Sequence, residues 1–322
     1  MVRLSILLAG CLLDAVLGDP YRLPHPIRWM GRLIAWMEKT LRPRFPKTAQ
    51  SERTGGTVMV LLVLALTIGC TAFLLYICKR FSFWLWWAVS AVICYYMLAA
   101  RSLAGESGKV YRALQSGTLE EAREAVSRIV GRDTAQLDRA GVARAAVETV
   151  AENTSDGVVA PLVYMAIGGP VWGVAYKAVN TMDSMVGYHN EKYENWGRTA
   201  AKLDDLVNFL PARLAGALMC AAAPLCGLDG RSAWRVFRRD RLNHKSPNSA
   251  HTEAACAGAL HLRLGGNSFY FGKLVEKPTI GDDLRPIQPE DIRRANRLMA
   301  VTACLTAALA GLGLLLCEVL LA

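Results

Sequence analysis

The sequence lacks the paired cysteines and histidines that mark structural metal sites and disulfide frameworks. Its nine cysteines are scattered, no two of them form a CxxC pair, and most lie in apolar runs. Its five histidines show no zinc-enzyme spacing such as HExxH. We therefore expect neither a disulfide framework nor a structural metal, and we interpret the cysteines as small buried apolar side chains.

The sequence also lacks a complete phosphate-binding loop of the Walker type. The segment ending in Gly108 and Lys109 comes close, but Leu103 stands where the pattern needs glycine and Val110 where it needs a hydroxyl. The loop also needs a preceding strand, and a long apolar run precedes it here. We reject the phosphate loop and keep Glu106 and Lys109 as candidate polar site residues.

Acidic residues are fewer than basic ones, which gives a net charge of +10, but no nucleic-acid-binding motif accompanies the charge. We expect no nucleic-acid partner. Basic loops that orient a membrane protein, together with anionic substrates, explain the charge more simply. The basic residues concentrate between residues 19 and 56 and between 229 and 297, and such loops stay in the cytoplasm.

Long apolar runs dominate the rest of the chain, in which 53% of the 322 residues are hydrophobic. Thr57–Cys78 and Phe81–Ala100 carry no charge, and Met299–Ala322 is broken only by Glu318. Each is long enough to cross roughly 30 Å of hydrocarbon. In the second run, tryptophans near one end and tyrosines nearer the other resemble an aromatic belt. We predict three membrane helices here.

Three further runs are interrupted or short. Leu4–Leu17 carries Asp14, and we interpret it as a retained membrane helix, because a secretion signal would need more basic residues and a longer apolar stretch. Val158–Ala175 and Leu206–Leu228 contain prolines, and the former also paired glycines. Interrupted helices are tolerated at membrane depth only where they are buried in protein or line a water-filled cavity. They are buried, re-entrant or kinked crossings, and the sequence leaves these alternatives open.

The predicted fold class is an all-α polytopic integral membrane protein with about four to six membrane helices, some broken or re-entrant. We expect a single membrane-embedded catalytic domain over residues 1–322, with soluble excursions at 19–56, 101–157 and 229–297. The positive loops predict a location in the inner membrane of the cell with the active site facing the cytoplasm. A homo-oligomer is left open.

A charged stripe precedes the fourth apolar run. In a helix, Arg144, Glu148, Glu152 and Asp156 are spaced four residues apart and share one face. Such carboxylates at a membrane boundary suit Mg²⁺ that carries a nucleotide, because Mg²⁺ accepts a few carboxylates plus phosphates. The alternative is a solvated helix face on which Arg144 pairs with Glu148.

Two more polar segments flank apolar runs. Lys177, Asn180, Asp183 and Gly187 share a helical face, and the pair Asp204–Asp205 opens the fifth run, one turn before an asparagine. The aspartates either bind a ligand or interact favourably with the positive N-terminal end of the helix dipole. The segment from Lys245 to Glu253 contains Ser-Pro-Asn-Ser before a helix of small residues, which suits a phosphate or an ordinary N-cap.

Together these motifs resemble the CobD/CbiB family, whose members are adenosylcobinamide-phosphate synthases of cobalamin biosynthesis. The resemblance runs over nearly the whole chain in the expected order, on these segments: Asp14–Pro20 with His25–Pro26, Glu148–Gly157, Lys177–Gly187, Asp204–Asp205 and Ser246–Glu253. It implies a membrane ligase that joins adenosylcobyric acid, a corrinoid, to aminopropanol phosphate or ethanolamine phosphate with ATP and Mg²⁺. The alternatives are an AmpE-like signalling or accessory protein and a transporter, and we find no inverted repeat to support the latter.

Residue chemistry then suggests roles at the positions that the resemblance supports. The proposed metal ligands are Glu148, Glu152, Asp156, Asp183 and Asp205. The proposed phosphate-binding and nucleotide-binding residues are Lys109, Arg144, Lys177, Lys245 and Asn180. We expect Ser246, Asn248 and Ser249 to hold the amino-alcohol phosphate, and Glu253 or His251 to take the proton of the amine. These residues form one site only if the fourth and fifth runs do not cross fully or are deeply buried.

Overall fold

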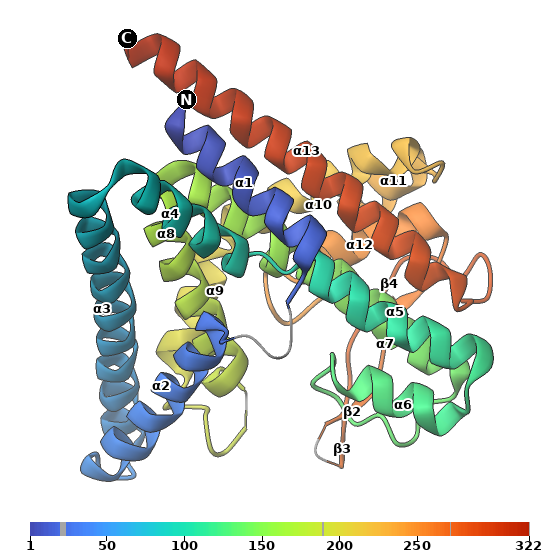
Figure 1. Ribbon diagram of the computed structural model, residues 1–322. Coiled ribbons are helices and arrows are strands. Elements are labelled where there is room, and N and C mark those ends of the chain that lie inside the picture. The colour runs from blue at the N-terminus through green and yellow to red at the C-terminus, as the bar shows by residue number, and fades with distance from the viewer. Residues whose placement is uncertain (20–23, 189, 271, 322) are drawn as a thin grey trace. The chain divides into compact units, whose positions relative to one another are not determined.

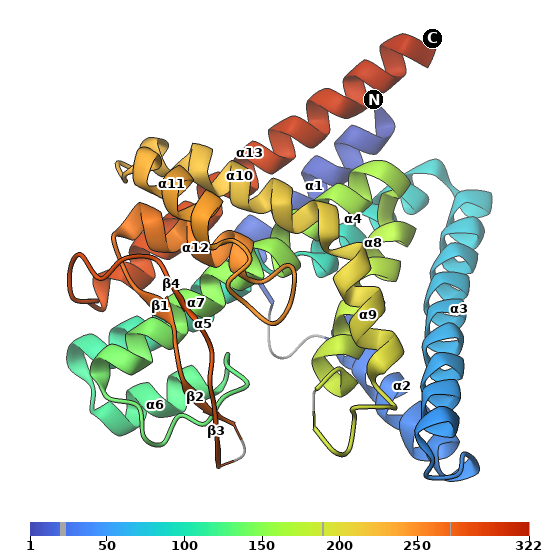
Figure 2. The same ribbon diagram turned by 180° about the vertical axis from the view of Figure 1, so that it is seen from behind.

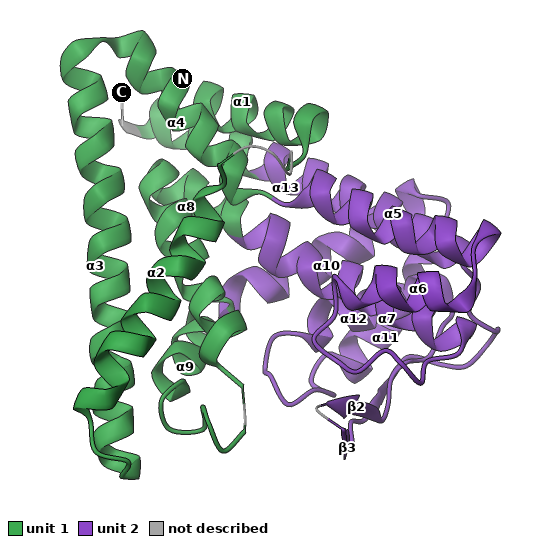
Figure 3. Cartoon of the chain, turned by 60° about the horizontal axis from the view of Figure 1, so that its bottom comes forward, with its two compact units in different colours: residues 1–98, 161–208, 310–322 green, residues 99–160, 209–309 purple. Residues whose placement is uncertain are grey.

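The computed structural model describes residues 1–19, 24–188, 190–270 and 272–321. Residues 20–23, which include Pro20 at the end of the segment Asp14–Pro20, lie outside the described residues, as do His189 and Phe271. The chain is built almost entirely of helices (Figure 1). It divides into two compact units, which Figure 3 colours green and purple. The prediction of one catalytic domain is not tested by this division.

Unit 1 comprises Met1–Leu98, Pro161–Asn208 and Ala310–Ala322. Its helices are α1 (Val2–Leu17), α2 (Pro26–Leu41), η1 (Arg42–Arg44), α3 (Ala49–Phe81), α4 (Phe83–Met97), nearly all of α8 (Ala160–Val186), and α9 (Arg198–Val207).

Unit 2 comprises Ala99–Ala160 and Phe209–Leu309. Its helices are α5 (Ala100–Ser116), α6 (Leu119–Ser127), α7 (Arg139–Thr154), η2 (Ser155–Val159), α10 (Phe209–Leu225), α11 (Gly230–Asp240), α12 (Ala250–Leu260) and the first part of α13 (Glu290–Leu321). Its short strands are β1 (Leu264–Gly265), β2 (Ser268–Tyr270), β3 (Lys273–Val275) and β4 (Thr279–Ile280).

Four stretches of helix are long and apolar enough to cross a membrane: Ala49–Phe81, Phe83–Ser116, Arg139–Val186 and Glu290–Leu320. These helices overlap the three uninterrupted apolar runs of the sequence and the interrupted run Val158–Ala175, the fourth along the chain. The pair α9 and α10, bent by 47°, makes a fifth if it counts as one span. The predicted all-α polytopic membrane fold is confirmed. α1 has only 16 residues and is shorter than these spans.

The breaks in the fourth run have identifiable causes. Within α8, Gly169 adopts φ 70° and ψ −163°, directly before Pro170, so the helix is kinked where the sequence predicts an interruption. Pro161 has no N–H to donate to the preceding turn, and the Gly157 carbonyl accepts the N–H of Ala99 instead, at 3.0 Å. The junction between α7 and α8, Ser155–Val159, is a π-helical turn, and such turns are frequent at functional sites.

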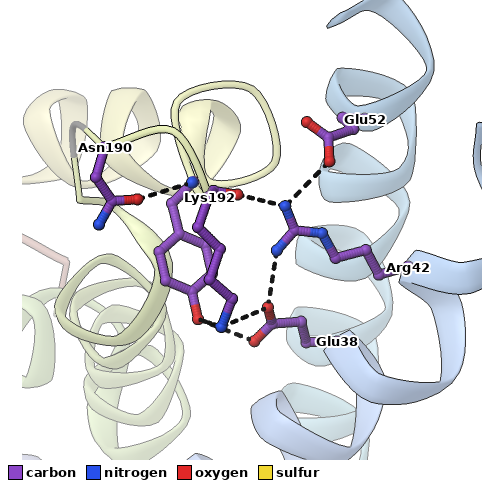
Figure 4. Close-up of polar contacts among 6 residues, drawn as sticks. Glu38, Arg42, Glu52, Asn190 and Lys192 are labelled. Atoms are coloured by element: carbon purple, nitrogen blue, oxygen red, sulfur yellow. Dashed lines mark hydrogen bonds and ion pairs between the residues drawn. The ribbon is translucent and has the colours of Figure 1, made fainter. Parts of the chain in front are cut away.

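In unit 1, a polar hub connects α2 and α3 to the loop that follows α8 (Figure 4). The guanidinium of Arg42 donates to Glu38 at 3.1 Å, to Glu52 at 3.0 Å and to the backbone carbonyl of Lys192. The ammonium of Lys192 lies 3.6 Å from Glu38 and donates to the Tyr193 hydroxyl at 2.6 Å. Part of the basic charge in the first loop is therefore matched by acidic side chains.

In unit 2, α12 is the central element, and every one of its residues is buried. Its small side chains allow close packing against α7, α10 and α11, which lie around it in Figure 1 and Figure 2. A Cβ on Gly258 would lie 2.6 Å from the Ser232 carbonyl oxygen of α11. Packing inside the unit therefore accounts for much of the apolar character of α10.

After α12 the chain forms an antiparallel ribbon. β1 pairs with β4, with Leu264 opposite Ile280, and β2 pairs with β3, with Ser268 opposite Val275. The chain reverses between Tyr270 and Lys273. Residues 264–268 belong to β1, β2 and the link between them.

Candidate active site

Of the charged stripe, Glu148 of α7 is buried in unit 2, whereas Arg144, Glu152 and Asp156 are half-buried. The Glu148 side chain is buried, with Oε1 accepting the Gly265 N–H at 2.7 Å and Oε2 accepting from Arg132. Burial acts to lower the pKa of Arg132, and the Glu148 carboxylate outweighs it, so that pKa is raised. Glu148 therefore holds the ribbon onto α7, and its partner is Arg132 and not Arg144, the partner in the alternative interpretation of the stripe.

Two other carboxylates of this unit have no such partners. Glu253 of α12 is only 6% exposed, and its pKa is raised well above the usual range by burial and by repulsion from Glu152 and Glu148. Within the described parts of the chain, neither Glu152 nor Glu253 has a hydrogen-bond or ion-pair partner. A buried acid without a partner is costly unless it is protonated or meets a cation, so this pair fits a cationic ligand.

Cationic and aromatic groups surround the carboxylate pair. The Lys277 ammonium draws the pKa of Glu253 down against the larger effect of burial, donates to the Tyr270 hydroxyl at 2.7 Å and lies 4.8 Å from the Tyr270 ring centroid. Burial lowers the pKa of His244, and the Glu152 carboxylate opposes that effect. No sequence motif marks Lys277, Tyr270, His244 and Arg132, because only the fold brings them to this place.

The serine-rich loop leads directly into α12. Its backbone is folded by local contacts: the Ser246 N–H donates to His244 Nδ1 at 3.0 Å, and the Asn248 N–H donates to Ser246 Oγ at 3.3 Å. Ser249 is the N-cap residue, yet its side chain makes no capping bond. The Asn248 side chain instead accepts from Arg213 at 3.4 Å. The first turn of α12 therefore has no side-chain cap, and its positive dipole end suits an anion.

His251, the second residue of α12, is fully buried in the core. Its side chain has no solvent exposure, and neither ring nitrogen has a hydrogen-bond partner among the described residues. Burial, and then repulsion from Arg213, lower its pKa to about 4. Its ring packs edge-on against Phe237 with a centroid separation of 5.9 Å. Of the two predicted proton acceptors, the surroundings favour Glu253, because a base with so low a pKa is weak.

The remaining predicted residues of unit 2 differ in their environments. Lys109 of α5 forms an ion pair with Glu106 at 2.6 Å. The Nε of Arg144 is buried and has no partner in the described part of the chain. Asp156 is half-buried on the π-helical turn η2, and Lys245 is exposed.

Unit 1 contains a separate polar network. Asp204 of α9 is buried; its Oδ2 accepts from Asn208 at 2.9 Å, and its Oδ1 accepts from Asn180 at 3.5 Å. Asn180 also accepts from Lys177 at 3.4 Å, and the Tyr176 hydroxyl donates to Asn208 at 2.9 Å. The predicted ligand Asp205 is half-buried, and its neighbour Asp204 accepts the hydrogen bonds of this network. Asp183 is also half-buried in this unit.

The predicted metal ligands are divided between the units: Glu148, Glu152 and Asp156 in unit 2, Asp183 and Asp205 in unit 1. Among the described residues, no group of three or more His, Cys, Asp or Glu side chains is placed to hold a metal. Mg²⁺ bound through a nucleotide needs only one or two protein carboxylates. Glu152 fits that need, and the meeting of all five predicted ligands stays a prediction.

Comparison with known proteins gives a consistent result. The family described as "CobD/Cbib protein" matches residues 7–299. The chain is 50% identical to the cobalamin biosynthesis protein CobD of Geobacter metallireducens, over 95% of both chains. It is 50% identical to that of Klebsiella pneumoniae, over 94% of this chain and 96% of the relative.

The cobalamin biosynthesis protein CbiB of Salmonella typhimurium is 47% identical, over 94% of this chain and 96% of its own. These relatives are named for biosynthesis and not for signalling or transport. No solved structure matches the chain. From the family match and this identity over almost its whole length, the chain belongs to the CobD/CbiB family.

Proposed function

We propose that this protein is a membrane enzyme of cobalamin biosynthesis that forms an amide bond with ATP and Mg²⁺. Its substrates are the propionate carboxylate of adenosylcobyric acid and the amine of aminopropanol phosphate or ethanolamine phosphate, and its product is adenosylcobinamide phosphate. Family membership over residues 7–299 supports the pathway. The observation that carries the chemistry is the buried Glu253 carboxyl beside Glu152, without a protein partner among the described residues, on the helix that the serine loop opens.

The reaction needs activation, because a carboxylate and an amine do not condense in water. A carboxylate oxygen of the corrinoid attacks the γ-phosphorus of ATP, the bond to the β-phosphate oxygen breaks, and ADP leaves. The amine nitrogen then attacks the acyl carbon of the resulting acyl phosphate. The C–N bond forms, orthophosphate leaves with the C–O electron pair, and the nitrogen loses one proton. Such chemistry depends on positioning and on cations around the transferring group.

The residues of unit 2 supply these needs. Glu152 would hold Mg²⁺, which when bound would neutralise charge on the triphosphate, and Glu253 is left for the amine. Lys277 and Arg144 provide cationic groups for phosphate oxygens. The uncapped start of α12, with Ser246 and Ser249, receives the phosphate of the amino alcohol. This assignment places the amino group near the first turns of α12, where Glu253 is located.

Glu253 also suits the proton transfer. Its pKa is raised well above the usual range by burial and by its carboxylate neighbours, which makes the ionised form a stronger base than an ordinary glutamate. In this proposal the ionised carboxylate accepts the proton that the amine nitrogen loses.

The proposed location is the inner membrane of the cell, with the site facing the cytoplasm. The chain has four candidate membrane spans, and its basic residues gather in loops. Positively charged loops stay on the cytoplasmic side. ATP and the anionic substrates are supplied on that side.

The test is a mass-spectrometric assay of the purified protein in detergent with adenosylcobyric acid, aminopropanol phosphate or ethanolamine phosphate, ATP and Mg²⁺. We expect an amidated corrinoid and one ADP per amide, and we expect Glu152→Gln to reduce turnover by about 10²-fold or more. Glu276→Gln, a change at an exposed glutamate of the ribbon, is the matched control.

An AmpE-like signalling role or transport predicts no corrinoid-dependent ADP. Its absence with every substrate pair would reject the ligase proposal, and unchanged turnover of Glu152→Gln would remove that residue from the metal site.

A further inference from the structure

The outer face of α11 is a stripe of arginines and one tryptophan. Five side chains spaced three or four residues apart line an open hollow of about 670 Å³: Arg231, Trp234, Arg235, Arg238 and Arg239. The opposite face of the same helix is buried, through Ser232, Ala233, Val236, Phe237 and Asp240. The helix is therefore strongly amphipathic, and we call its outer face the arginine stripe.

The charge of the arginine stripe is only partly balanced. Arg239 pairs with Asp240 at 2.7 Å and with Asp282 at 2.8 Å, and Arg235 lies 3.8 Å from the same Asp282. Among the described residues, the guanidinium groups of Arg231 and Arg238 have no carboxylate partner. Arg238 instead lies 5.9 Å from the ring centroid of Trp234, which is 37% exposed. The stripe thus presents excess positive charge beside an indole.

The position of α11 in unit 2 brings this stripe next to apolar surface. α11 runs back along α10: a Cβ on Gly230 would lie 2.9 Å from Pro224, and one on Gly216 would lie 2.4 Å from the Phe237 ring. α10 in turn exposes Leu210 and Leu225, at 73% and 66%. Guanidinium groups are expensive in hydrocarbon, so the α10–α11 pair places its stripe at water or headgroup depth.

We propose that the arginine stripe binds the phosphate groups of anionic membrane lipids. The chain has four candidate membrane spans, so a bilayer is its permanent neighbour. Unpaired guanidinium groups attract the negative headgroups, and tryptophan favours the boundary between headgroups and acyl chains. The amphipathic helix rests on the membrane surface, with the apolar side chains of α10 beside it. This assignment does not depend on the amide-forming reaction.

The experiment compares lipid retention by the full-length protein, purified in mild detergent and mixed with equal amounts of phosphatidylglycerol and phosphatidylcholine. Native mass spectrometry counts each lipid that stays bound. The test variant carries Arg231→Gln and Arg238→Gln. The matched control carries Arg128→Gln and Arg263→Gln, which remove two exposed arginines that already pair with Glu124 and Asp283.

We expect the wild-type protein to retain phosphatidylglycerol preferentially, and the test variant to lose this preference by about 25-fold, since each basic residue near an anionic surface contributes roughly fivefold. The control and the charge-keeping pair Arg231→Lys with Arg238→Lys retain it. An unchanged preference in the test variant, an equal loss in the control, or no preference in the wild-type protein overturns the proposal. Displacement of the lipid by inorganic triphosphate assigns the stripe to a soluble anion and also overturns it.

Discussion

One buried carboxylic acid in each unit, Asp204 in unit 1 and Glu253 in unit 2, differs from the other in how the surrounding protein satisfies it. In unit 1, both oxygens of Asp204 accept hydrogen bonds, from Asn180 and Asn208, and Asn208 is fixed in turn by the Tyr176 hydroxyl. In unit 2, Glu253 has no protein donor among the described residues and faces two other glutamates. A buried acid whose oxygens accept hydrogen bonds destabilises the fold little and fixes local structure. A buried acid without such bonds destabilises the fold, and a bound ligand can offset that free energy.

The same contrast separates neighbours on one helix. Glu148 and Glu152 lie one turn apart on α7, yet Glu148 uses both oxygens on Arg132 and Gly265, and Glu152 uses neither within the described chain. We infer that Glu148 and Asp204 are positioning residues, and that Glu152 and Glu253 are the residues that meet the ligand.

The largest effect is expected for Glu253→Gln, which keeps the shape of the side chain and removes the base. Turnover should fall by about 10²- to 10⁴-fold, the usual contribution of a positioned acid or base. Corrinoid and ATP consumption, followed by mass spectrometry, measures this loss. His251→Gln is the comparison, and a larger loss there than in Glu253→Gln would reverse our choice between the two proton acceptors.

Loss of the unit 1 network should reduce stability more than it alters chemistry. Asp204→Ala leaves the buried amide of Asn208 and the half-buried amide of Asn180 without their acceptor, and the unpaired buried amide costs about 1–3 kcal/mol. Thermal unfolding in detergent measures the change, with Asp205→Ala as the matched control at the half-buried neighbour. Equal destabilisation by both variants would contradict the assignment of Asp204 as the structural acid.

Much of this fold can be predicted from the sequence, because the patterns that indicate its helices, kinks and caps involve residues close together in the chain. Uninterrupted apolar runs predicted the spans, and Gly169 with Pro170 predicted the kink. The capping box of α6 was also readable, since Thr118 and Glu121 form both reciprocal bonds. These features depend on a few neighbouring residues and not on the tertiary fold.

The candidate site was only partly readable, because its partners are distant in sequence. Arg132 and Gly265 meet at Glu148 only through the fold of unit 2, and the ribbon that carries Lys277 gave no separate signal. The choice between Asp204 and Asp205 did have a local signal, in the exact spacing of the asparagine one turn on. Asn208 follows Asp204 by four residues, the spacing at which helical side chains meet.

The raised pKa of Glu253 predicts a smaller effect, on the pH dependence of stability. Its pKa is higher in the folded protein than in the unfolded chain, so its contribution to stability is complete below the unfolded pKa and is lost as pH rises toward the folded pKa. Glu253→Gln, which stays neutral, should gain roughly 2 °C in Tm over the wild type per pH unit in this range. A constant Tm difference from pH 5 to pH 8 would contradict the raised pKa.

The smallest effect is expected where a single neutral hydrogen bond is removed from the satisfied network. Tyr176→Phe deletes the hydroxyl that donates to Asn208 at 2.9 Å and keeps the buried ring, which stacks on Tyr164 with a centroid separation of 5.1 Å. The free energy of unfolding should fall by about 1 kcal/mol, less than for Asp204→Ala, because Asn208 retains its bond to Asp204. Thermal unfolding of the single and double variants measures their coupling. Strict additivity would show that Tyr176 and Asp204 do not act as one network, and the contrast between a satisfied acid in unit 1 and an unsatisfied one in unit 2 would weaken.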